Sequence, residues 1–252
     1  MNLLQKKYMA ILLSSLVGIS ACSFLLLNMK SSSSKVPEVI HHGQAKDQSN
    51  IPTSESNSSI QKKTYSFNKL GSVSFYLSKK NPIPRDYKPS DLVKVNVQSL
   101  REEQLRREAS DAVQTLFKAA KQDGYSLQLI SAYRSYEYQQ KLYKSYLKKS
   151  SKSDLDRIDN LPGKSEHQLG LAIDLGDESR KYLLKESFAN TNLFKWLEKN
   201  SYKYGYILRY PDGKEDVTGY KFHPWSFRYV GKELALEIYK SGLTFDEFVQ
   251  KK

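Results

Sequence analysis

Cysteine is almost absent from this 252-residue chain, because the single example, Cys22, lies in an apolar stretch near the N-terminus. Disulfide bonds, a cysteine nucleophile and a cysteine-ligated zinc ion are therefore excluded from the rest of the chain. Histidine is scarce as well. Of the four in the chain, only His167 and His223 lie in the part that is rich in aromatic residues.

Acidic residues are outnumbered by basic ones, and the formal net charge is +13. The excess is +4 in residues 1–63 and +9 in the remainder. This sign favours anionic partners such as nucleic acid, acidic lipid or an anionic cell-wall polymer; a basic surface that serves only solubility is an equal alternative. We expect no nucleic-acid partner, because no basic run with interleaved aromatic residues and no nucleic-acid motif is present.

Long apolar runs are confined to residues 9–29, which follow Lys6 and Lys7. A basic segment before an apolar run is typical of an export signal. These 21 residues are long enough to span a bilayer of about 30 Å, with the lysines on the cytoplasmic side. Alternatively, residues 19–22 (ISAC) form a lipobox and Cys22 carries a lipid; the terminal position and basic flank disfavour a buried core helix.

We therefore predict a signal or membrane anchor over residues 1–29, which places the rest of the chain outside the membrane. Residues 30–63 are polar and almost free of aromatic side chains. Such a segment cannot bury enough apolar surface to offset its ordering entropy, so a flexible linker is predicted there. The folded, extracytoplasmic domain is predicted over residues 64–252.

Hydrophobic periodicity within this domain predicts both helices and strands. Ser99 and Glu102 match a capping box, and apolar residues at helical spacing then predict an amphipathic helix that ends at Gly124. Ser135 is the expected N-cap of a second helix, whose apolar side includes Tyr146 and Leu147. Further strands are expected at 127–132, 170–175, 206–210 and 220–230, and further helices at 192–200, 232–240 and 245–250. The absence of a regular βαβ alternation indicates an α+β domain.

Asp174 lies in an apolar predicted strand, seven residues after His167. An unpaired carboxylate is costly to bury, so this one needs a metal ion, an arginine or good hydrogen-bond donors. A salt bridge to Arg134 or Arg228 is the simpler alternative to a metal. Arg134 itself lies between a strand and a helix, a place that suits binding of a ligand carboxylate or pairing with an internal acid.

Three ordered segments resemble motifs of the VanY-type D-alanyl-D-alanine carboxypeptidases. Residues 131–135 (SAYRS), followed by Gln139, resemble the family's SxYRS motif. Residues 165–174 (SEHQLGLAID) resemble SxHQxGxAxD, and residues 222–231 (FHPWSFRYVG) resemble EPWHxRYVG. The resemblance extends over about residues 75–240 and implies a small central antiparallel sheet flanked by helices.

The resemblance implies a zinc peptidase that removes D-alanine from peptidoglycan stem peptides, with D,D or L,D specificity. Zinc with three protein ligands activates a water, and a carboxylate moves its proton to the leaving amine. By position, His167 and Asp174 match two zinc ligands. The residues that match substrate-binding positions, with Arg134 for the C-terminal carboxylate, are Ser131, Tyr133, Arg134, Gln139 and Ser165.

The third motif departs from the family at both working positions. The catalytic glutamate of the family is replaced by His223, and its third zinc-ligating histidine by Ser226. One hypothesis is therefore a catalytically impaired cell-wall protein that recognises stem peptides. The other is an active zinc carboxypeptidase in which His223 joins the ligands and Glu166 is the nearest acidic candidate for the base. Expected partners are stem peptides, the membrane through the anchor, and anionic wall polymers.

Overall fold

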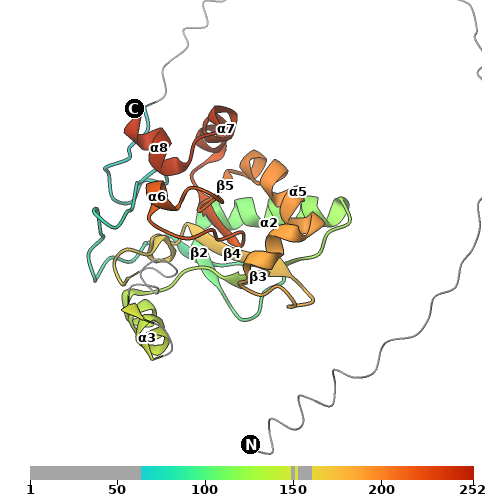
Figure 1. The fold of residues 1–252 in the computed structure, drawn as a ribbon, viewed down its shortest axis with the longest axis horizontal. Coiled ribbons are helices and arrows are strands. Elements are labelled where there is room, and N and C mark those ends of the chain that lie inside the picture. Colours follow the sequence, from blue (N-terminus) through green and yellow to red (C-terminus); the bar gives the residue numbers. More distant parts are fainter. Residues whose placement is uncertain (1–63, 149–150, 153–160) are drawn as a thin grey trace, which may run out of the picture. The chain divides into compact units, whose positions relative to one another are not determined.

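The computed structural model describes residues 64–148, 151–152 and 161–252 (Figure 1). The predicted anchor, lipobox and linker lie outside these residues. Within the described part, no helix combines the length and apolar character needed to cross a membrane.

A four-stranded antiparallel sheet in the order β3-β4-β6-β5 lies at the centre of the domain. Its strands are β3 (Leu127–Ser131), β4 (Ala172–Asp177), β5 (Tyr206–Leu208) and β6 (Ser226–Tyr229), and a separate hairpin joins β1 (Leu92–Lys94) to β2 (Gln104–Arg106). The α+β class with a small antiparallel sheet is thus confirmed. The last strand is shorter than predicted. Pro224 has no N–H for a ladder, and the N–H of His223 instead bonds to the carbonyl of Tyr210, so residues 220–225 form a loop.

The helices surround this sheet, with α3 on one side and α7 and α8 on the other (Figure 1). They are α2 (Arg107–Gln122), α3 (Tyr136–Leu147), α5 (Asn192–Asn200), α6 (Glu215–Thr218), α7 (Lys232–Ser241) and α8 (Phe245–Gln250). Three 3-10 turns complete the described elements: η1 (Glu166–Leu169), η2 (Glu186–Asn190) and η3 (Ser201–Tyr204). The predicted helices near 192–200, 232–240 and 245–250 are confirmed.

Helix α2 begins later than predicted, and the capping box of Ser99 and Glu102 is wrong. Ser99 forms a parallel bridge with Leu129, and the N–H of Leu100 bonds to the Leu129 carbonyl. Residues 104–106 then pair in β2 before the helix starts. Residues 99 and 100 therefore pair through their backbone with the distant strand β3 instead of starting a helix.

Helix α3 has the expected N-cap, because the Ser135 side chain accepts a hydrogen bond from the N–H of Tyr138. Its predicted apolar side is only partly buried. Tyr143 is buried, whereas Tyr146 and Leu147 are exposed. The helix lies at the edge of the domain (Figure 1), so burial of a few side chains is enough to hold it. Tyr146 instead lines a cavity.

Buried side chains tie the sheet to its surroundings. The hydroxyl of the fully buried Tyr206 in β5 donates to the carbonyl of Ala109 in α2. Arg228 in β6 is also fully buried and donates to the carbonyls of Val73 and Phe75, which attaches the first described segment to the sheet. These bonds satisfy groups that would be costly to bury unpaired.

Candidate functional site

The register of the central sheet places three polar residues side by side. Asp174 in β4 lies opposite Ser131 of β3 and Ser226 of β6, and all three are buried. A register irregularity between Leu129 and Ser131 precedes this row. Such irregularities are common beside active sites, where they redirect a side chain. The sheet thus forms a polar floor with a carboxylate at its centre.

The turn η1 brings His167 over this carboxylate. It ends at Gly170, whose φ of +66° favours glycine, and a Cβ there would lie 2.9 Å from Leu92 Cδ2. The chain can therefore turn sharply from η1 into β4. As a result, His167 Nε2 lies 3.3 Å from Asp174 Oδ2.

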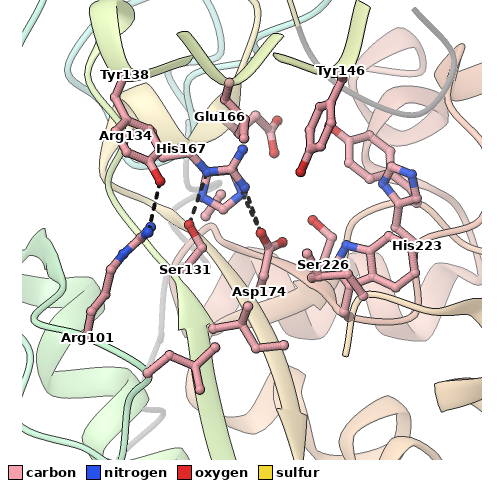
Figure 2. Close-up of a pocket in the computed structure, with 17 residues that line it drawn as sticks. Arg101, Ser131, Arg134, Tyr138, Tyr146, Glu166, His167, Asp174, His223 and Ser226 are labelled. Atoms are coloured by element: carbon pink, nitrogen blue, oxygen red, sulfur yellow. Dashed lines mark hydrogen bonds and ion pairs between the residues drawn. The ribbon is translucent and has the colours of Figure 1, made fainter. Parts of the chain in front are cut away.

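Arg134, which follows β3, connects the whole group (Figure 2). Its Nη2 lies 2.7 Å from Asp174 Oδ2 and 2.8 Å from His167 Nε2. Its Nε donates to Ser131 and its Nη1 to the Oε1 of Gln139 in α3, which orients the guanidinium. The partner of the buried carboxylate is thus Arg134 and not Arg228, which pairs with Glu166.

The hydrogen bonds assign the tautomer of His167. Its Nδ1 lies 2.6 Å from the carbonyl oxygen of Ala132, which only accepts, so Nδ1 carries the proton. An arginine only donates, so Nε2 accepts from Arg134 through its lone pair. Burial alone would raise the pKa of the Asp174 carboxyl, but the adjacent guanidinium of Arg134 lowers it, and the net pKa lies below its usual range. Asp174 is therefore ionised at neutral pH.

His223 and Ser226 form the other side of the floor. The imidazole of His223 is 5% exposed, stacks on Trp225 with ring centroids 4.7 Å apart, and meets Tyr210 edge-on. Among the described residues, its Nε2 has no hydrogen-bond partner. Burial lowers the pKa of His223 to about 4, so the ring is neutral at pH 7.

This pKa predicts an acid-dependent loss of stability. Between pH 6.5 and 4 the unfolded state binds a proton on His223 that the folded state does not, so stability falls as the pH falls through this window. The loss amounts to about 3 kcal/mol. Urea unfolding at several pH values should show this slope in the wild type and a shallower one in His223→Gln. Parallel curves for the two proteins would contradict the buried, neutral state.

A cavity of about 420 Å³ opens above the floor. Figure 2 shows Tyr138 and Tyr146 on the side away from Asp174, and Arg101 donating to the Tyr138 hydroxyl. The lining residues that sequence reasoning missed are largely apolar or aromatic: Leu100, Arg101, Ile130, Tyr138, Leu142, Tyr146, Leu184, Tyr210 and Trp225. Of these, Trp225 carried a sequence signal, because it lies within the third motif, whereas the others come from segments outside the three motifs.

The remaining predicted residues lie outside the cavity lining. Gln139 accepts a hydrogen bond from Arg134, Tyr133 is half-buried, and Ser165 is fully buried with no partner for its hydroxyl among the described residues. None of these three lines the cavity. The Oε1 of Glu166 accepts a hydrogen bond from Arg209 and forms an ion pair with Arg228, whereas its Oε2 has no hydrogen-bond partner among the described residues.

The central antiparallel sheet thus presents a His–Asp–Arg group at the floor of a cavity. A model of the family "D-alanyl-D-alanine carboxypeptidase" (VanY) matches residues 102–232. The chain therefore belongs to the VanY family of D-alanyl-D-alanine carboxypeptidases. It contains a carboxypeptidase-like domain.

Similar proteins agree with this assignment. The chain is 41% identical over 180 residues to the "Putative carboxypeptidase YodJ" of Bacillus subtilis, covering 69% of this chain and 66% of that protein. It thus spans just under two thirds of that relative's length. A solved structure of the LdcB LD-carboxypeptidase, which addresses how that protein recognises peptidoglycan, is also similar. The two chains are 40% identical with a TM-score of 0.68, and the match covers 72% of this chain and 87% of that one. A mutant of the D,D-pentapeptidase VanY, solved in complex with Zn(II), is 33% identical with a TM-score of 0.59, covering 71% and 99%.

The residues of this chain fit such a zinc ion only in part. His167 Nε2 and Asp174 Oδ2 are close enough to bind one ion together. Because the proton of His167 is on Nδ1, its Nε2 has the lone pair that a zinc ligand needs. However, Ser226 stands where the family has its third zinc ligand. The described residues contain no group of three His, Cys, Asp or Glu side chains arranged for a metal. The three-ligand set of a catalytic zinc site is therefore not assembled.

Proposed function

We propose that this chain recognises the C-terminal end of peptidoglycan stem peptides and is impaired in their hydrolysis. The observation that carries the proposal is the contrast within one cavity. Arg134 and its supports Ser131 and Gln139 are in place, whereas His223 and Ser226 occupy the positions of the base and of the third ligand.

The cavity offers chemistry that suits a peptide terminus. A carboxylate is best bound by a guanidinium whose planar donors are already oriented. Arg134 is held in this way at the floor, and apolar and tyrosine side chains above it suit the methyl groups and backbone of a short peptide. The family name supports D-alanine as the terminal residue.

The same residues disfavour hydrolysis. A general base must reach the proton that it accepts, but the Nε2 of His223 is buried, and burial also disfavours the protonated form of its ring. Glu166, the nearest acidic residue in the sequence, is a poor replacement, because its Oε1 pairs with both Arg209 and Arg228, which stabilises the unprotonated carboxylate. We also propose that residues 1–29 direct export and anchor the chain in a membrane. The basic domain would then contact anionic wall polymers.

Peptide binding tests the first part. Calorimetry with tri-, tetra- and pentapeptide stems should show binding to the wild type. In Arg134→Lys it should be about 10- to 100-fold weaker, because the charge remains but the fork of donors is lost. Arg85→Lys is the control, since Arg85 lies on the surface and pairs with Glu137. Absence of binding to every stem, or equal affinity in Arg134→Lys, would refute the proposal.

The unpartnered Nε2 of His223 favours a second candidate, an active site rearranged around that nitrogen. A wild-type chain that releases D-alanine from a stem peptide, and loses this activity in His167→Ala, would support it over the binding protein.

A further inference from the structure

We propose that the guanidinium of Arg134 takes the position of the family's metal ion, so that the site formed by His167 and Asp174 binds no zinc in this protein. Both atoms that would ligate the ion already accept hydrogen bonds from one nitrogen, Nη2 of Arg134, at 2.8 and 2.7 Å. The inference concerns the metal alone and does not depend on peptide recognition.

The lone pairs show that these contacts exclude a metal. Because Nδ1 of His167 donates to the Ala132 carbonyl, Nε2 has a single lone pair in the ring plane. That lone pair accepts from Arg134. A zinc ion needs the same lone pair as its ligand, so the arginine must first withdraw.

The charges at this position are already balanced. Asp174 and Arg134 are both buried and form an ion pair, and His167 is neutral by its hydrogen bonds. Adding a divalent ion beside Arg134 would set three positive charges against one carboxylate in a place with little solvent. The other carboxylate that lines the cavity, Glu166, already balances the buried cations Arg209 and Arg228.

Position 226, where the family has a zinc-ligating histidine, is a serine in this chain. This difference explains why Arg134 and not a metal ion occupies the site. Ser226 lies directly opposite Asp174 across the sheet, where it offers only a neutral hydroxyl, which is not among the usual protein ligands of zinc. His223 does not replace it, because its ring is stacked on Trp225 and its Nε2 is enclosed. Two donors compete poorly with a guanidinium that is held by Ser131 and Gln139.

Zinc titration of the full-length chain tests the proposal without any peptide or activity assay. The wild type should purify without stoichiometric zinc, and added ZnCl2 should leave its Tm unchanged. In Arg134→Ala the position is vacated, so ZnCl2 should raise the Tm by several degrees, about what 1–2 kcal/mol of ligand linkage produces. This rise should be absent from Arg134→Ala/His167→Ala, which lacks the imidazole ligand.

Two outcomes would overturn the inference. One is a wild-type chain that carries about one zinc and loses it in His167→Ala. The other is a folded Arg134→Ala variant that zinc does not stabilise. If Arg134→Ala fails to fold, Ser226→His decides, because a third ligand should make zinc binding at least about tenfold tighter than in the wild type; equal affinity would refute the inference. Failure of peptide binding, by contrast, would leave all these metal measurements unchanged.

Discussion

Replacement of Glu166 by glutamine should lower the free energy of unfolding by about 3–5 kcal/mol, the cost of removing one partner from a buried ionic network. The Oε1 of Glu166 lies 2.9 Å from both Arg209 and Arg228, and both arginines are almost inaccessible to solvent. Asp246 in α8 also pairs with Arg209. Two cations and two carboxylates are therefore balanced, and the substitution would leave two buried cations with a single carboxylate.

Glutamine has nearly the shape of glutamate and keeps an acceptor oxygen, so the measured loss would report on charge and not on packing. Urea unfolding at pH 7 is the measurement. Glu102→Gln is the control, because Glu102 pairs with Lys94 at the surface, where ion pairs contribute little. Similar stability of Glu166→Gln and Glu102→Gln would show that the buried network is not balanced as described.

The second large effect should come from restoring the third motif. The double variant His223→Glu/Ser226→His replaces both departures with the family's residues. Its release of D-alanine from a stem peptide should exceed that of the wild type by about 10²–10⁴-fold, the usual contribution of a general base. Zinc, where it is bound, supplies the activation of water. The pocket floor is otherwise complete, because Arg134, His167 and Asp174 are in place.

Single variants separate the two departures. His223→Glu alone restores a carboxylate and Ser226→His alone restores a ligand, and neither should approach the double variant. Adding His167→Ala to the double variant should return release to the wild-type level. If the double variant is no more active than the wild type, the two substitutions are not what impairs this chain. The assay is amino-acid analysis of released D-alanine at matched protein concentration.

Local patterns in the chain were sufficient for much of the fold. Helix α5 was predicted with its observed bounds, 192–200, and the strand over 127–132 was confirmed as β3. Both elements depend on periodicity and on capping by nearby residues, which short-range physical chemistry specifies. The motifs likewise identified Arg134, His167 and Asp174 as one group, and the structure brings them within hydrogen-bonding distance.

Contacts between distant segments decided the rest. Serine is a residue type that favours helix N-caps, yet the backbone of Ser99 pairs with that of Leu129, thirty residues later. The choice of Arg134 over Arg228 as the partner of Asp174 follows from the strand register, because Arg228 lies opposite Ala172 and is held by Glu166. The enclosed ring of His223 depends on Trp225 and Tyr210. Periodicity and motifs are set by residues a few positions apart, whereas the partner of a buried charge is set by which strands and turns the tertiary fold brings together.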